Sequence, residues 1–218
     1  MTILCIETST SVCSAAICKD GEPSHQCICR EGSNHARLLP RYIEELLSFA
    51  REHALSIEAI ALSEGPGSYT GLRIGTSTAK GLCYGLNIPL IPIPTLDILC
   101  EAARQQGAKG RLCPMIDARR MEIYTMVGGE TKAVVVENEE SLYAGDDEIT
   151  YFGDGAEKCS KIFTKPNWHY IPDIVPQAQY MGRLANERLA ISGERIAYYE
   201  PFYLKEFIAA PSHVKGLQ

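Results

Sequence analysis

The chain has 218 residues, of which 45% are hydrophobic and 22% charged, which suffices for an ordinary packed core. The net charge is −6, so the chain does not have the excess of basic residues that is typical of a protein that binds RNA without a partner. We therefore expect any contact with nucleic acid to be made through a partner. The nine cysteines contain no Cys-x-x-Cys pair and are expected to be reduced core residues. Because no apolar run has the pattern of a signal peptide or a membrane span, we expect a cytoplasmic protein without membrane contact.

The first half of the chain has the pattern of three strands followed by alternating helices and strands. Apolar or alternating runs at 3–7, 12–19 and 24–30, with a turn at 20–21, predict a β-meander. Leu39, Ile43 and Leu46 have helical spacing and predict a helix over 36–53, with Ser33 or Asn34 as its cap. The elements expected next are a strand at 57–62, a helix at 72–86, a strand at 89–93 and a helix at 96–105. This βββαβαβα order is that of an actin-like, ribonuclease-H-like lobe.

A second set of strands follows, and the whole chain is therefore predicted to be α/β with two related lobes. Strands are expected at 112–116, 123–127 and 133–136, and a helix at 177–192, whereas 138–176 shows no clear periodicity. The second lobe is thus abbreviated. The predicted domains are 1–107, an actin-like lobe with partner-binding helices, and 108–218.

A glycine-rich stretch at 63–75 lies between an apolar strand and a helix, and it comprises Gly65, Gly67, Ser68, Thr70, Gly71 and Arg73, with Gly75 beyond them. Glycines let a backbone approach closely, and Ser68 and Thr70 can cap the helix, so its amides could face an anion. A tight turn with close helix packing explains the pattern equally well. A P-loop is excluded because Gly71 precedes Leu72 and Arg73, and a dinucleotide fingerprint would need glycine at Thr70.

The same stretch, Gly-Pro-Gly-Ser-Tyr-Thr-Gly-Leu-Arg-Ile-Gly at 65–75, resembles the signature of the TsaB (YeaZ) family. Further stretches resemble the family in the same order: 3–10, 35–40, 79–82, 88–90 and 117–124. Beyond about residue 130 the likeness is confined to 153–155 and 201–205. The family implies an accessory subunit for N6-threonylcarbamoyladenosine formation in tRNAs that read ANN codons.

Two regions are possible nucleotide or phosphate sites, and each has a structural alternative. In actin-like ATPases the turn after the first strand binds phosphate, which here indicates Thr8, Ser9 and Thr10, although such residues also satisfy any tight turn. Asp117 matches a phosphate-site acid of that superfamily, or forms a salt-bridged turn with the arginines beside it. Glu7 departs from the aspartate usual in the kinases and ATPases. ATP or ADP is therefore possible in the complex, and the sequence assigns no cofactor to this chain itself.

Residues typical of metal or nucleophilic catalysis are not found together in the sequence. The catalytic paralogue, TsaD, resembles this fold and carries His-x-x-x-His on a helix, where i and i+4 side chains share a face, but Thr95 and Leu99 stand there in this chain. The histidines are dispersed at positions 25, 35, 53, 169 and 213. Ser68 is not in a nucleophile elbow, and nothing orients a cysteine. We expect no metal and no catalytic residue here, with iron or zinc only in the partner.

What the resemblance implies is a binding role on two helices, with the interface residues His35, Leu38, Arg41, Tyr42, Ile74, Gly75, Thr78 and Leu82. The expected partners are a TsaD-like paralogue, a TsaE-like ATPase and, indirectly, tRNA, and a homodimer through the same patch is the competitor. This protein would then not be an enzyme on its own. The alternatives are a small-molecule kinase or ATPase of the actin-like superfamily and, more remotely, a metallopeptidase.

Overall fold

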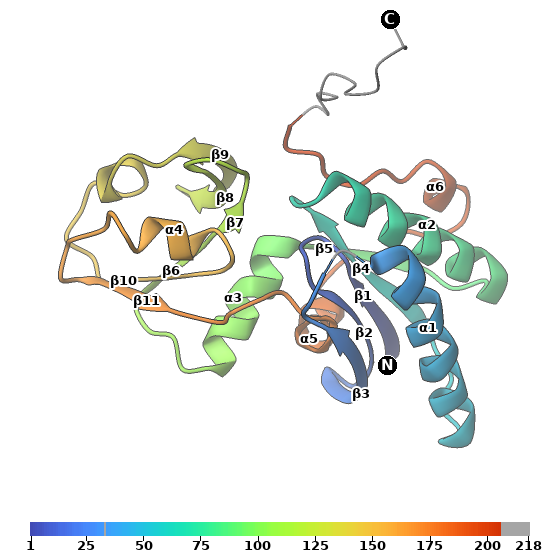
Figure 1. The fold of residues 1–218 in the computed structure, drawn as a ribbon. Coiled ribbons are helices and arrows are strands. Elements are labelled where there is room, and N and C mark those ends of the chain that lie inside the picture. The colour runs from blue at the N-terminus through green and yellow to red at the C-terminus, as the bar shows by residue number, and fades with distance from the viewer. Residues whose placement is uncertain (33, 206–218) are drawn as a thin grey trace, which may run out of the picture.

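The computed structural model describes residues 1–32 and 34–205, and its centre is a five-stranded mixed sheet in the order β3-β2-β1-β4-β5 (Figure 1). The strands are β1 (Thr2–Glu7), β2 (Cys13–Lys19), β3 (Glu22–Cys29), β4 (Ala59–Gly65) and β5 (Leu90–Pro94). β1 is antiparallel to β2 and parallel to β4. Because helices cover both faces of the sheet, every residue of β1 is buried, and buried and exposed residues do not alternate along it. Within these residues, no helix is long and apolar enough to cross a membrane.

The predicted meander is confirmed, and its turn has the chemistry of a two-residue hairpin. Lys19 pairs with Glu22, so Asp20 and Gly21 form the loop. Their φ angles are 53° and 94°, and glycine and aspartate tolerate such values better than most residues. β3 is thereby fixed at the edge of the sheet.

Two long helices, α1 (His35–Glu52) and α2 (Tyr69–Leu86), lie next to each other on one face of this sheet (Figure 1). The inner stripe of α1 is the one predicted, with Leu39, Ile43 and Leu46 buried against Leu4 and Ile6 of β1. Burying such side chains contributes about 1.5–3 kcal/mol each, which holds the helix on the sheet. Asn34 occupies the N-cap position of α1 without a side-chain cap bond, and Ser33, the other predicted cap, lies outside the described residues.

The opposite face is covered by α3 (Thr95–Gln105) and by a segment that returns late in the chain. The 3-10 helix η2 (Ala178–Tyr180) and α5 (Met181–Asn186) pack on the sheet, and α6 (Glu194–Ala197) contacts α2. Elements from both sides of the predicted 107/108 boundary therefore pack on the five-stranded sheet. The single helix expected over 177–192 is wrong: the segment is divided into η2 and α5, and residue 191 pairs with β5.

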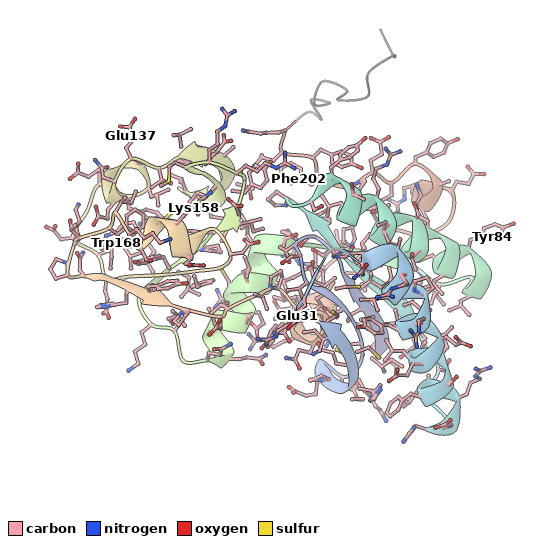
Figure 2. The ribbon with its side chains drawn as sticks, viewed as in Figure 1. Glu31, Tyr84, Glu137, Lys158, Trp168 and Phe202 are labelled. Atoms are coloured by element: carbon pink, nitrogen blue, oxygen red, sulfur yellow. The ribbon has the colours of Figure 1, made fainter. Side chains whose placement is uncertain are left out.

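The middle of the chain forms two three-stranded sheets at the other side of α3 (Figure 1). One is the parallel sheet of β6 (Arg111–Pro114), β10 (Ile149–Phe152) and β11 (Trp168–Ile171), and the other contains β7 (Ile116–Asp117), β8 (Glu122–Val127) and β9 (Glu130–Val135). A short helix, α4 (Ala156–Cys159), packs against β10. Trp168, labelled in Figure 2, contacts Phe163 edge to face and belongs to the core of these sheets.

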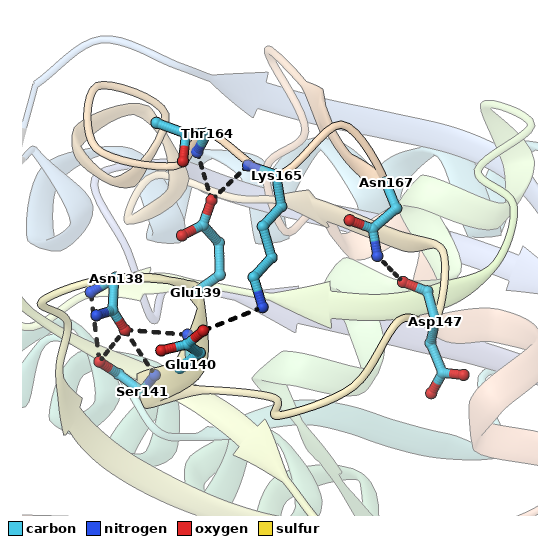
Figure 3. Close-up of polar contacts among 8 residues, drawn as sticks. All are labelled: Asn138, Glu139, Glu140, Ser141, Asp147, Thr164, Lys165 and Asn167. Carbon is cyan, nitrogen blue, oxygen red and sulfur yellow. Dashed lines mark hydrogen bonds and ion pairs between the residues drawn. The ribbon is translucent and has the colours of Figure 1, made fainter.

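The acidic segment without periodicity is ordered by side-chain bonds to backbone amides (Figure 3). Asn138 caps the 3-10 helix η1 (Glu139–Ser141), and buried Glu139 accepts hydrogen bonds from the amides of Thr164 and Lys165. Burial alone would raise the pKa of Glu139, but these amides and the Lys165 charge hold it below its usual value. Asn167 donates to the Asp147 carbonyl at 2.7 Å. The contacts of Glu139 and Asn167 join residues that are 20 to 26 positions apart in the chain, so periodicity could not predict them.

Candidate functional site

The glycine stretch packs against the chain's own first turn. A Cβ added at Gly67 would lie 2.2 Å from the Ser9 carbonyl oxygen, and one at Gly71 would lie 2.0 Å from the Thr8 carbonyl oxygen. At Gly75 the added atom would lie 2.4 Å from the Thr8 hydroxyl. Real side chains essentially never approach so closely, so glycine is required at all three positions by packing between α2 and the turn after β1.

The hydroxyl groups of that turn already have partners within the protein. Thr8 Oγ1 donates to the Gly71 carbonyl at 2.8 Å, while the Ser9 amide and hydroxyl both donate to Glu7 Oε1 at 2.5 Å. Thr8 and Ser9 are fully buried and Thr10 nearly so. The glycine loop and the predicted phosphate turn are thus one interlocked unit, in which Thr8 does not reach the surface.

Glu7 lies at the end of β1, directly under this unit, and is buried completely. Burial raises the pKa of the Glu7 carboxyl, and hydrogen bonds from Ser63 and Ser9 only partly oppose the shift. Ser63 in turn contacts the Thr95 hydroxyl at 2.8 Å, so a buried polar chain links β1, β4 and α3. Thr95 and Leu99, which the sequence analysis placed at the histidine positions of the paralogue, are both buried, and Leu99 offers no ligand atom.

A cavity of about 700 Å³ lies between the first turn and β7. Its walls include, among the predicted residues, Ser9, Thr10, Gly67, Ser68, Thr70, Gly71 and Asp117, together with His35. Its walls also include Arg119, Tyr124, Asp154 and Lys205, which lie in the family-like stretches but were not predicted as site residues. Lys205 belongs to the returning 201–205 segment, whose Phe202 amide donates to the Glu64 carbonyl at 2.7 Å.

Asp117 faces this cavity in the geometry of an ion-paired turn. It contacts Lys158 Nζ and accepts from the Arg119 amide at 3.0 Å. Asp154 lies beside it and accepts a hydrogen bond from the Asp117 amide at 2.9 Å, and desolvation by the surrounding protein raises the pKa of its carboxyl. Two carboxylates therefore lie close together next to Lys158. The ion pair of Asp117 is made with Lys158 and not with the arginines beside it, and phosphate binding by Asp117 stays a prediction.

A second hollow, of about 480 Å³, lies between the outer faces of α1 and α2 and is called the α1–α2 groove below. Its lining residues are Ala36, Pro40, Tyr69, Thr70, Arg73, Ile74, Ser77 and Thr78. Arg73 is held beside Tyr69, with its guanidinium 2.9 Å from the phenol oxygen and 5.2 Å from the ring centroid. Only Ile74 and Thr78 were predicted interface residues. Thr70 and Arg73 were predicted as glycine-loop residues, and the remaining lining residues were not predicted because the sequence alone does not set how α1 and α2 face one another.

Two of the predicted interface residues lie inside the protein. Gly75 is buried under Thr8, and His35 is 5% exposed, with its Nε2 3.1 Å from the Val12 carbonyl oxygen. Neither presents a side chain on the outer faces of α1 and α2, and their role in an interface stays a prediction. Leu38, Tyr42 and Leu82 are half-buried and pack on the core, whereas Arg41 is exposed. The most exposed large side chain of α2 is Tyr84, which points away from the body (Figure 2).

Comparison with known proteins assigns this arrangement to a class. The family model described as TsaD, tRNA N6-adenosine threonylcarbamoyltransferase, matches residues 31–192. Two solved structures from Pseudomonas aeruginosa have the same fold: a YeaZ structure, 28% identical with a TM-score of 0.70, and a protein with similarity to peptidase YeaZ, 25% identical with a TM-score of 0.74. They cover 93% and 94% of this chain and 99% of their own. The chain belongs to this threonylcarbamoyltransferase-related class of α/β proteins.

Within that class the relatives narrow the assignment. The tRNA threonylcarbamoyladenosine biosynthesis protein TsaB of Escherichia coli is 29% identical over 96% of both chains. TsaB of Haemophilus influenzae is 36% identical over 57% of this chain, and TsaB of Bacillus subtilis 35% identical over 57%. Those two matches span only about half of the relatives' length, 52% and 54%. The chain is a member of the TsaB (YeaZ) family, as its motifs predict.

Proposed function

We propose that this chain is a non-catalytic accessory subunit for N6-threonylcarbamoyladenosine formation in tRNA, and that it binds and activates a TsaD-type paralogue. The observation that carries the proposal is the α1–α2 groove. Small side chains such as Ser77 and Ala36 line it, and small residues let the helices of a partner approach closely. An interface needs a well-packed apolar centre and a polar rim. In this groove Ile74 could supply part of the centre and Arg73 part of the rim.

The chemistry itself would belong to the partner. In actin-like ATPases the turn after the first strand binds phosphate, whereas here the backbone at Gly67 and Gly71 packs directly against this turn. The hydroxyls of Thr8 and Ser9 in the turn are hydrogen-bonded within the protein. This supports a binding role over turnover by this chain. The proposal includes a catalytic metal in the partner only, ATP or ADP within the complex, a TsaE-like ATPase as a further subunit, and tRNA reached through the complex in the cytoplasm.

Two finer statements belong to the same proposal. The five-stranded sheet with its helices, and the two small sheets, are proposed to be a complete and an abbreviated actin-like lobe. A homodimer is proposed to use the same α1–α2 groove, and it would then compete with the paralogue for one surface.

The docking surface is tested by a charge at its centre. Ser77 is exposed on α2, so Ser77→Arg should fold normally but prevent co-elution with the TsaD-type partner. Ser56→Arg is the matched control, since Ser56 is also exposed but does not line the groove. Gly75→Arg would be a poor test, because Gly75 is buried against Thr8 and Leu62 and the variant would unfold. Unchanged co-elution of Ser77→Arg would refute the assigned surface.

The role is tested by nucleoside mass spectrometry of unmodified tRNA incubated with threonine, bicarbonate, ATP, the adenylate synthase and the TsaD-type and TsaE-type proteins. Modification should appear only when this chain is added, and Ser77→Arg should not support it. Modification without this chain would refute the accessory role. Intrinsic ATP turnover by the isolated chain would favour a kinase or ATPase acting at the 700 Å³ cavity.

A further inference from the structure

Three potential metal ligands of different chemistry meet where the edge strand β3 faces α1. They are the imidazole of His25, the thiol of Cys27 and the carboxylate of Glu45, and their ligand atoms all lie within 4.8 Å of one another. His25 Nε2 is 2.9 Å from Glu45 Oε1. In the described part of the chain, this is the one group of three such side chains found this close together.

The backbone brings these residues together for simple geometric reasons. Side chains two apart on a strand point to the same face, so His25 and Cys27 both face α1. Glu45 lies on α1 directly before the buried Leu46, at the margin of the helix that meets β3. The sequence alone does not predict the group, because Glu45 is 18 residues beyond Cys27 and joins it only through helix packing.

The orientation of the imidazole is fixed by an aromatic stack. The His25 ring lies on Phe49 with centroids 4.7 Å apart and an interplanar angle of 14°. His53 stacks on Phe49 as well, at 4.0 Å, and its Nδ1 is 2.9 Å from the Phe49 carbonyl oxygen. A ligand held by packing loses less rotamer entropy on binding, so His25 is already placed for coordination.

Exposure falls from the rim of the group to its base. The Cys27 residue is 7% exposed, whereas the side chains of His25 and Glu45 are 36% and 58% exposed. A cation could therefore enter from solvent and bind a shielded sulfur, with water as its fourth ligand. Burial, followed by Glu45, raises the pKa of the Cys27 thiol to about 12. Coordination of Cys27 as a thiolate would release its thiol proton to solvent.

We propose that His25, Cys27 and Glu45 form a binding site for one zinc-type divalent cation. Sulfur, imidazole nitrogen and carboxylate oxygen are the ligand types that Zn²⁺ accepts, and it takes four ligands in a tetrahedron. One thiolate and one carboxylate balance the charge of a divalent ion, so the occupied site is neutral. Hard cations such as Mg²⁺ prefer all-oxygen sites and do not fit a buried thiol.

The cation would link the edge strand to α1. β3 has a sheet neighbour on one side only, β2, and its contacts with α1 are otherwise made by packing. The site lies apart from the α1–α2 groove, since none of its three residues lines that hollow. The proposal of a metal site can therefore be refuted or supported independently of the proposed docking function.

The site is tested with Co²⁺, which reports its ligands spectroscopically. The metal-free full-length chain is titrated with Co²⁺, then with Zn²⁺ as competitor, and its unfolding temperature is measured with and without Zn²⁺. We expect one Co²⁺ per chain, a thiolate-to-cobalt charge-transfer band in the near ultraviolet, displacement by Zn²⁺, and a raised unfolding temperature. Cys27→Ser should abolish the band. His25→Gln and Glu45→Gln should weaken binding by at least about 10-fold.

Each variant has a matched control from the same region. His53→Gln alters the other histidine of the Phe49 stack, Glu44→Gln the adjacent exposed carboxylate, and Cys83→Ser another buried thiol of the same core. All three should bind Co²⁺ as the unaltered chain does. No charge-transfer band, or wild-type affinity in both His25→Gln and Glu45→Gln, overturns the proposal. These two changes affect partly exposed side chains, so the test does not depend on whether Cys27→Ser folds.

Discussion

Replacing Gly71 by alanine should destabilise the protein, although alanine is the better helix former. In an unhindered helix the change would stabilise by about 1 kcal/mol. Here the new methyl carbon would be 2.0 Å from the Thr8 carbonyl oxygen, a backbone atom that cannot move alone. Overpacking of this kind costs about 1–3 kcal/mol and occasionally more. Displacing the turn also weakens the bond from Thr8 Oγ1 to the Gly71 carbonyl, worth about 1 kcal/mol.

The sum is a net loss of about 2 kcal/mol or more, and the same helix supplies the control. Gly81 is exposed on α2 with no heavy atom within 4 Å of an added Cβ, so Gly81→Ala should stabilise by about 0.5–1 kcal/mol. Urea unfolding followed by circular dichroism gives both free energies. If Gly71→Ala were as stable as the unaltered chain, the close packing of the glycine loop on the first turn would be refuted, and the loop could serve a ligand instead.

Three further outcomes follow from burial. Burial raises the pKa of Glu7 above its ordinary 4.5, so the contribution of this group to the free energy of unfolding is full below about pH 4.5 and is lost as the pH rises through the folded-state pKa. Glu7→Gln should therefore become more stable relative to the unaltered chain as the pH rises. A pH-independent difference between the two in urea unfolding would contradict this. Thiol labelling at neutral pH should modify half-exposed Cys29 first and spare Cys113, whose pKa burial raises to about 12; equal rates by peptide mass spectrometry would count against the packing of β6. Phe152→Ala should lower the free energy of unfolding by about 3–5 kcal/mol, since Phe152 is 0% exposed, whereas exposed Leu189→Ala should change it little; similar losses in calorimetry would show that Phe152 is not in the core.

The glycine stretch shows how far a motif alone can be interpreted. Its spacing excluded a P-loop and a dinucleotide fingerprint, and its resemblance to the TsaB family is confirmed by the comparisons. The need for close backbone approach also followed from the residues. Which backbone approaches did not, because Thr8 is more than 60 residues away and meets Gly71 only in the folded chain.

The same distinction explains the interface predictions. Helical spacing correctly predicted the buried stripe of α1, since each helix has one face toward the sheet. It could not show that Gly75 is covered by Thr8 or that Ala36, Pro40 and Ser77 line one hollow. Those facts depend on the separation and relative rotation of two helices, which side chains from several elements set together.

The sequence by itself determined the local elements and the family. The local elements are the hairpin at Asp20 and Gly21, the two long helices and the first five strands in their order along the chain. The family follows from the ordered motifs shared with TsaB proteins. These depend on periodicity, turn chemistry and residue identity, which are local properties. Only the tertiary structure decided the return of 178–186 to the first sheet, the closed first turn, and the meeting of His25, Cys27 and Glu45. Such contacts join distant parts of the chain, and they are fixed by the packing of whole elements and not by any one segment's own preference.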